Sequence, residues 1–236
     1  MTNVRVIIMR SRIIKFSILY ILLFFIFEAY ANVTINGTRV IYEGNKREAS
    51  ILVTNHDENR PYLIQSFISV DANGKKAPFV VTPPLFRLDA GKENILRIMR
   101  TGGDLPLDRE SIFYLNVKAI PSAQDNMQNT LFITVKTRIK LFYRPEKIQG
   151  DAEESYKLLT FRRLGKLLEV KNPSNYYVTI NQLKIGNQIV NLNDTDMIAP
   201  QEIAYFNISA NSSNLISWNS INSYGGISAE MKKNLP

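Results

Sequence analysis

The sequence contains few of the side chains that carry out covalent or metal chemistry. Its 236 residues include no cysteine and one histidine, His56. The lack of cysteine excludes disulfides, thiolate zinc sites and cysteine nucleophiles, and a single histidine excludes a metal site built on two of them. His56 lies in an Asn- and Asp-rich turn, and we interpret it as a solvated residue. We therefore expect a protein that is not an enzyme and that uses no metal and no cofactor.

The first 31 residues have the pattern of a secretory signal. Several basic residues precede an uncharged apolar run from Phe16 to Phe27, and an A-x-A motif ends at Ala31. This run is shorter than the ~20 residues that span a bilayer, so an uncleaved N-terminal anchor is the less favoured alternative. We predict that residues 1–31 are a signal peptide that is removed after Ala31.

The positive charge of the chain at first suggests a nucleic-acid partner. Removal of residues 1–31 takes away four basic residues and one acid, which lowers the formal charge from +8 to +5. That charge is modest, and an exported protein has little access to nucleic acid. No later stretch is long and apolar enough to cross a membrane. We expect neither a nucleic-acid partner nor a membrane span in the mature chain.

The residues after the signal predict an all-β protein. Short runs rich in Val, Ile, Phe, Tyr and Thr alternate with turn-forming segments, and no helical apolar stripe persists for three turns. About seven such runs in ~110 residues is typical of an immunoglobulin-like sandwich. The runs in the first half are 32–42, 49–55, 61–70, 77–81, 93–99, 111–120 and 130–143.

A second series of strands follows a stretch with proline and several charges, 144–151, which we interpret as an interdomain linker. The second series predicts another, smaller sandwich. We therefore assign the domains as 1–31, 32–147 and 148–236. The predicted strands of the last domain are 156–161, 166–172, 176–185, 188–192, 203–208, 214–218 and 227–231.

One predicted strand is unusually long. Residues 131–143 contain neither Pro nor Gly, whereas strands are typically ~5–6 residues long. Alternation places Leu131, Ile133, Val135 and Ile139 on one face. This apolar row could belong to the core of the same domain. Alternatively, a strand at a sheet edge could offer the row to another protein, since its unpaired N–H and C=O groups pair readily with a second chain.

Several motifs occur in an order that resembles the periplasmic chaperones of the chaperone–usher pathway, the PapD-like family. The resemblance extends over essentially the whole mature chain, and its most specific parts are the Asp108–Ser111 and Lys140–Pro145 stretches. The motifs are GTRVIY at 37–42, TPPLFRL at 82–88, LPLDRES at 105–111, LNVKAIP at 115–121, IKLFYRP at 139–145, NP at 172–173, IAP at 198–200 and INSYGG at 221–226.

The resemblance implies two immunoglobulin-like sandwiches arranged as an L with an interdomain cleft. It also implies a function: the protein binds, stabilises and caps fimbrial or pilus subunits in the periplasm by lending them a strand, and delivers them to an outer-membrane usher. By position, the lent side chains of this donor strand are Leu131, Ile133 and Val135.

The resemblance assigns an anchor for the C-terminal carboxylate of the subunit to Arg39 and Lys140. A one-residue slip would turn every lent side chain to the wrong face, so such an anchor would also fix the register. Each of these residues alone would be read as a solvated surface charge, and only the surrounding motif distinguishes them.

A third set of residues implied by the resemblance is an ion-pair network between the domains. Glu110 and Arg144 match its glutamate and arginine. The sequence departs from the family at the usual N-D-Y-G stretch, where Ser223 replaces the aspartate. Serine supplies no negative charge, so either the network is reduced to a pair or another acid takes this place.

Further implications concern the partners. The short segment 122–129 and the absence of a cysteine pair resemble the subclass with a short loop between the last two strands of the first domain. The family also places usher-facing residues at Leu63, Gln65 and Thr82–Pro84. Family members can associate with themselves through the donor strand, and nothing in the sequence decides this for the free protein.

The alternative function is that of a secreted sandwich protein, either an adhesin or a structural subunit of a fimbria. A subunit would be a shorter, incomplete sandwich, often with a disulfide, whereas this chain has two predicted sandwiches and no cysteine. We therefore favour the chaperone.

Overall fold

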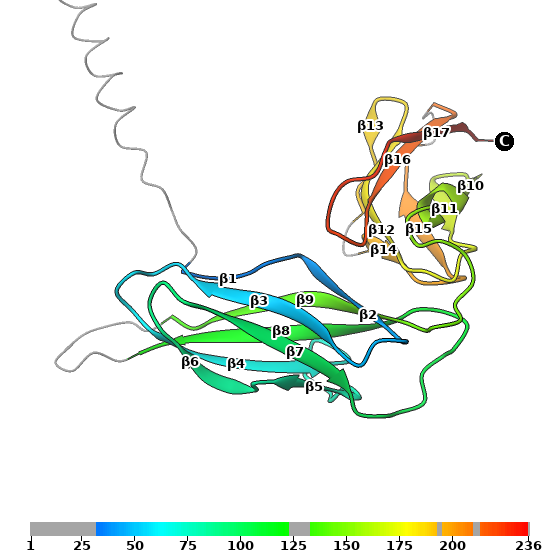
Figure 1. Cartoon of the computed structure of the whole chain (residues 1–236). Coiled ribbons are helices and arrows are strands. Elements are labelled where there is room, and N and C mark those ends of the chain that lie inside the picture. The colour runs from blue at the N-terminus through cyan, green and yellow to red at the C-terminus, as the bar shows by residue number, and fades with distance from the viewer. Residues whose placement is uncertain (1–31, 123–132, 193–194, 210–212, 236) are drawn as a thin grey trace, which may run out of the picture. The chain divides into compact units, whose positions relative to one another are not determined.

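The computed structural model describes residues 32–122, 133–192, 195–209 and 213–235, which form two groups of strands (Figure 1). Nearly all of their regular structure is β-strand. Within these ranges the helical structure is a single four-residue 3₁₀ turn, η1 (Ser155–Leu158), and no helical membrane span is found there. The prediction of an all-β chain is confirmed.

The first group of strands forms two sheets. One has the order β1-β3-β7-β5, and the other, which we call the five-stranded sheet, has the order β2-β9-β8-β4-β6. All neighbours are antiparallel except β2 and β9, which run parallel. The strands are β1 (Val33–Ile35), β2 (Arg39–Glu43), β3 (Ala49–Asn55), β4 (Tyr62–Ser69), β5 (Phe79–Thr82), β6 (Leu85–Leu88), β7 (Glu93–Arg100), β8 (Ser111–Pro121) and β9 (Val135–Arg144).

The chain passes from one sheet to the other between β1 and β2. Gly37 has a φ of 140°. Residues with a Cβ atom adopt this backbone conformation only with strain. The amide of Asn36 still donates to the carbonyl of Leu52 in β3, while Arg39 already pairs with β9. This switch delivers Arg39 to the five-stranded sheet.

The core of the first sandwich consists of alternating side chains from both sheets. Val53 and Leu96 from one sheet and Ile64, Leu115 and Leu141 from the other have no exposed surface. Burial of this kind contributes about 1.5–3 kcal/mol per large aliphatic side chain, so this domain can be stable without disulfides.

The second group of strands has a separate hydrophobic core. Its sheets have the orders β10-β11-β15 and β13-β12-β16-β17, with β14 also paired to β12. Trp218 is buried there, packs against Phe161 and donates from Nε1 to the carbonyl of Tyr156. The strands are β10 (Thr160–Leu164), β11 (Leu167–Lys171), β12 (Val178–Ile185), β13 (Gln188–Ile189), β14 (Met197–Ile198), β15 (Ile203–Asn207), β16 (Leu215–Ile221) and β17 (Met231–Asn234).

The structure differs from the predicted strands at several places. The run predicted over 32–42 is divided into β1 and β2, and β14 was not predicted. The long run predicted over 131–143 corresponds to β9, which begins at Val135; Ile133 is described outside any strand, and Leu131 lies outside the described residues. The segment predicted at 227–231 meets β17 only at Met231. The sequence pattern did not predict β6, because the preceding Pro83-Pro84 pair is unfavourable within a strand.

Candidate functional site

The structure brings Arg39 and Lys140 together. The parallel register of β2 and β9 makes them direct neighbours, although they lie far apart in the sequence. Side chains that are direct neighbours on adjacent strands point to the same face of the sheet. Two cationic groups therefore meet on the outer face of the five-stranded sheet.

Arg39 is only partly satisfied by its surroundings. Its Nη1 donates to the carbonyl of Ile221 over 3.1 Å, and its guanidinium lies 5.7 Å from the ring centre of Phe142. Its Nε is buried and has no hydrogen-bond partner in the described part of the chain. Burial lowers the pKa of Arg39, while the acids Asp196, Glu110 and Glu153 act in the opposite direction. Arg39 thus retains capacity for an anionic ligand.

A small cavity adjoins this arginine. Its volume is about 20 Å³, and its lining includes Arg39, Glu110, Arg144 and Thr179. A space above about 10–15 Å³ can hold one water-sized polar group. The hydroxyl of Thr179 is also buried without a hydrogen-bond partner among the described residues. Two of the residues that line the cavity, Arg39 and Thr179, therefore each have a buried polar atom without a hydrogen-bond partner among the described residues.

Lys140 is engaged by an acid from the second sandwich. Its Nζ donates to Oδ2 of Asp196 over 3.2 Å. The Lys140 side chain is 24% exposed and that of Asp196 is 51% exposed. Ion pairs of this exposure are worth about 0–1 kcal/mol. This contact is therefore weak enough to be exchanged for another anion.

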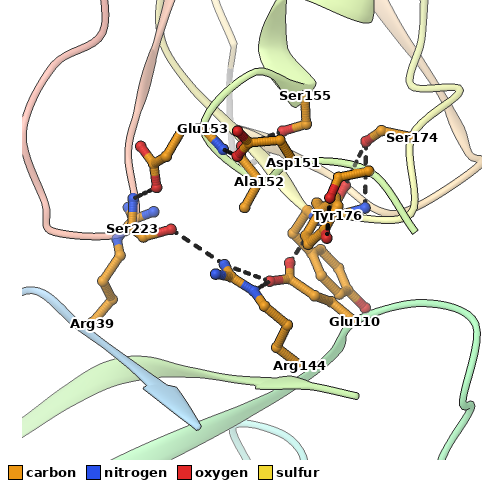
Figure 2. A network of polar contacts seen from close by, with 12 residues as sticks. Arg39, Glu110, Arg144, Asp151, Ala152, Glu153, Ser155, Ser174, Tyr176 and Ser223 are labelled. Carbon is orange, nitrogen blue, oxygen red and sulfur yellow. Dashed lines mark hydrogen bonds and ion pairs between the residues drawn. The ribbon is translucent and has the colours of Figure 1, made fainter. Parts of the chain in front are cut away.

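A second ion pair, between Glu110 and Arg144, lies with Arg39 around the small cavity. Arg144 at the end of β9 binds Glu110 at 2.9 Å, and the Glu110 side chain is only 3% exposed. The second carboxylate oxygen of Glu110 accepts from the amide of Tyr177 at 2.9 Å. Figure 2 shows Arg144 between Glu110 and Ser223, whose hydroxyl accepts from Nη2 of Arg144 at 3.2 Å.

Ser223 takes up the missing aspartate position without replacing its charge. Its hydroxyl contacts Arg144, and its amide donates to Oε1 of Glu153 over 3.2 Å (Figure 2). The sequence left open whether another acid would replace the aspartate. In the structure Glu153 lies next to Ser223 but binds its amide rather than Arg144. The described side-chain hydrogen bonds of Arg144 therefore go to one carboxylate and one hydroxyl, and its guanidinium also lies 5.3 Å from the ring centre of Tyr176.

Burial dominates the electrostatics of Glu110. It raises the pKa of this carboxyl, and Arg144 and the Tyr177 amide offset the effect only in part. Glu110 therefore binds a proton more readily in the folded chain than in the unfolded chain. The contribution of this proton uptake to the free energy of unfolding is fully present at low pH. It is lost as the pH rises through the pKa of Glu110 in the folded state.

One edge of the first half of β9 has no partner strand among the described residues. Residues from Val135 to Ile139 pair with β8 on one side, while β2 covers the other side only from Lys140 onward. Val135 is 57% exposed, and the preceding Ile133 is 68% exposed. Ile139, on the same face, is buried in the core. Two of the three predicted donor residues are therefore exposed, and the third, Leu131, lies outside the described residues.

The predicted usher-facing residues lie on neighbouring segments. Leu63 and Gln65 are exposed residues of β4, and their cross-strand neighbours in β6 include Leu85, which is 55% exposed. The turn at Pro83-Pro84 is fixed to β4, because both prolines accept hydrogen bonds from Ser66. Thr82 ends β5 and is exposed. Leu63 and Gln65 thus lie on the outer face of the five-stranded sheet and Thr82 on the other sheet, and the turn at Pro83-Pro84 lies between β5 and β6.

Sequence reasoning missed two residues of this site, Asp196 and Tyr177. Asp196 stands in the polar stretch Asn-Asp-Thr-Asp, which reads as an ordinary turn, and Tyr177 contributes through its backbone amide. Neither carries a local signal, because each is defined by a partner in the first sandwich.

Replacing Glu110 with Gln should give a variant whose stability relative to the wild type depends on pH. As the pH falls from 7 toward the unfolded value near 4.5, the wild type should gain free energy of unfolding relative to Glu110→Gln, because its folded state takes up the proton first. Urea unfolding of both proteins across this range measures the difference. A relative loss of wild-type stability at low pH would contradict this assignment.

Comparison with known proteins covers both sandwiches. The profile described as "Pili and flagellar-assembly chaperone, PapD N-terminal domain" matches residues 32–149, and "Pili assembly chaperone PapD, C-terminal domain" matches 154–232. The probable fimbrial chaperone LpfB of Escherichia coli O157:H7 is 41% identical over 86% of this chain and 88% of its own length. The chaperone protein FimC of Escherichia coli K12 is 36% identical over 98% of both chains.

Solved structures give the same result. A chain of the Salmonella enterica SafA pilin in complex with the SafB chaperone superposes with a TM-score of 0.78 at 31% identity, covering 89% of this chain and 98% of that chain. The periplasmic chaperone SfaE superposes with a TM-score of 0.74 at 38% identity, covering 86% of this chain and 100% of that chain. From these matches over both sandwiches we conclude that the chain belongs to the PapD-like family of pilus-assembly chaperones.

Proposed function

We propose that this protein binds, stabilises and caps fimbrial subunits in the periplasm by donor-strand complementation and delivers them to an outer-membrane usher. Membership in a chaperone family confirms the expectation that the chain is not an enzyme. The observation that carries the mechanism is the unpaired edge of β9 from Val135 to Ile139, which ends where Arg39 and Lys140 meet.

The exposed edge of β9 supports strand lending. An unpaired strand edge offers N–H and C=O groups to an added strand. Leu131, Ile133 and Val135 would insert into the open core of the subunit, and each buried aliphatic side chain contributes about 1.5–3 kcal/mol before ordering costs. Ile133 and Val135 are already exposed in the free chain, so no core contact of the chaperone has to break.

The anchor residues lie where they can define the register of the added strand. β2 occupies one side of β9 from Lys140 onward, so an added strand can occupy only the preceding part of that side. If the added strand runs parallel to β9, its C-terminus points toward Arg39 and Lys140. Charge-assisted hydrogen bonds to that carboxylate would fix the register.

We propose that the Glu110–Arg144 pair keeps the residues around Arg39 in position. Its contacts to the Tyr177 amide and the Ser223 hydroxyl link the end of β9 to the second sandwich. We propose that this network holds the walls of the small cavity next to Arg39. The structural departure at Ser223 makes the link less charged than the family pattern implies.

The surface around Leu63, Gln65 and Thr82–Pro84 is our proposed contact for the usher. It lies on β4 and at the end of β5, away from the anchor residues on β2 and β9. Self-association of the free protein through the edge of β9 would use the same backbone groups as a subunit, so the two would compete.

The chaperone function is favoured over the alternative of a secreted adhesin or fimbrial subunit. The two profile matches together extend from residue 32 to residue 232 and cover both sandwiches. A single incomplete sandwich would account for only one of these matches.

Residues 1–31 should be removed during export. The family match begins at residue 32, directly after the A-x-A motif, which supports the predicted cleavage after Ala31. Mass spectrometry of protein recovered from the periplasm of an expressing bacterium should give a mature chain that starts at Asn32. Recovery of the uncleaved chain in the membrane fraction would instead support an N-terminal anchor.

Arg39→Ala and Lys140→Ala should leave the protein folded but abolish recovery of a co-expressed fimbrial subunit from the periplasm. Each change removes one of the two cationic groups of the anchor, and both residues lie outside the hydrophobic core. Circular dichroism verifies folding, and co-purification measures the complex. Wild-type yields of the complex in both variants would refute the anchor role.

Ile133→Asp should prevent complex formation, because a carboxylate buried in the subunit core without a partner carries a cost of several kcal/mol. Ile189→Asp is the matched control: Ile189 is also 68% exposed but lies in β13 of the second sandwich, so this variant should bind normally. Undiminished binding by Ile133→Asp would argue against the donor strand.

Leu63→Asp should keep subunit binding and impair only assembly with the usher.

A further inference from the structure

The acid that engages Lys140 has no role in the anchor as proposed so far. Asp196 places a carboxylate oxygen 3.2 Å from the Lys140 Nζ, and it is the strongest favourable charge acting on Arg39. Its carboxylate is the same chemical group that terminates a subunit. The inference below rests on the proposed anchor for the subunit carboxylate.

We propose that Asp196 is an internal substitute for the subunit carboxylate, which occupies Lys140 in the unloaded chaperone and is displaced when the subunit binds. Asp196 thereby determines how tightly the anchor holds a subunit terminus. Because the incoming carboxylate exchanges with one that is already present, Lys140 is not left without a counter-ion before or after loading.

The mobility needed for this exchange is confined to a side chain. The backbone next to Asp196 is fixed, since its carbonyl accepts from the amide of Ile180 and Met197 already pairs with Thr179 in β12. The side chain itself is 51% exposed and has space to rotate into solvent. Release of Lys140 therefore requires no rearrangement of a strand.

Asp196 forms an ion pair with only one of the two anchor cations, Lys140. Asp196 accepts no hydrogen bond from the Arg39 Nε, which has no partner in the described part of the chain, and the described hydrogen bond of Arg39 goes to the Ile221 carbonyl. A subunit carboxylate that reaches both cations can make more charge-assisted hydrogen bonds than Asp196 does. It can therefore displace Asp196, which makes capture favourable and keeps it reversible.

Other acids near the anchor are less suited to this role. Glu110 is buried and bound by Arg144 and the Tyr177 amide. Glu153 accepts from the Ser223 amide. Among the described residues, Asp196 alone forms an ion pair with Lys140.

The test compares two forms of one short synthetic peptide of alternating Val and Thr, one with a free C-terminal carboxylate and one with a C-terminal amide. The mature chain should bind the carboxylate form more tightly. Asp196→Asn should strengthen binding of the carboxylate form by about two- to fivefold, the range expected for loss of one partly exposed competing ion pair, and should leave binding of the amide form unchanged. Calorimetry measures both affinities.

The matched control is Asp89→Asn. Asp89 is 61% exposed and pairs with Arg87, so this change removes the same charge from another exposed ion pair and should leave both affinities unchanged. Asp196→Ala is a second variant, since asparagine retains an oxygen that can accept from Lys140. The Nζ resonance of Lys140 in ¹⁵N spectra should shift in both Asp196 variants and report the loss of the contact directly.

The outcomes separate this inference from the proposed function. If the wild type prefers the carboxylate peptide but the Asp196 variants bind it equally or more weakly, the substitute role is overturned and the anchor stands. If the wild type does not distinguish the two peptides, the anchor fails and the inference fails with it. Tighter carboxylate binding in both variants, with Asp89→Asn unchanged, supports the substitute.

Discussion

The site depends on where β2 begins to pair with β9. The switch at Gly37 takes the chain from one sheet to the other, and pairing in the five-stranded sheet then starts at Arg39 and Lys140. Before this point β9 is paired on one side only among the described strands; after it, β9 is paired on both sides. A single register thus defines both the length of the open edge and the position of the cations at its end.

The charged groups around the start of the β2–β9 pairing differ in burial, and these differences fit the roles that we propose for them. In the Glu110–Arg144 pair the acid is only 3% exposed and the pair is bound from both sandwiches, as expected for a structural link. In the Lys140–Asp196 pair the acid is 51% exposed, so the partner of Lys140 can change. Arg39 lies between these extremes, with one buried nitrogen left unpaired. A ligand site needs such unsatisfied capacity, because fully paired groups offer nothing to a partner.

The free edge of β9 also carries a risk of aggregation. Exposed apolar residues such as Ile133 and Val135 on an open strand edge favour aggregation. The same sheet carries cationic side chains next to this edge: Lys136 lies over the Phe67 ring and Arg138 over the Tyr114 ring. Charges beside an open edge oppose uncontrolled pairing with other chains, while the exposed apolar row on the opposite face stays available to a subunit.

The sequence by itself determined the all-β class, the two sandwiches and most strands, because alternation and turn residues are local signals. The family motifs also predicted roles for Arg39, Lys140, Glu110 and Arg144. Only the tertiary structure decided that β9 begins at Val135 and that Asp196 binds Lys140. Strand ends depend on which neighbour supplies a partner, and an ion pair depends on distance in space. Neither is encoded in the residues next to it along the chain.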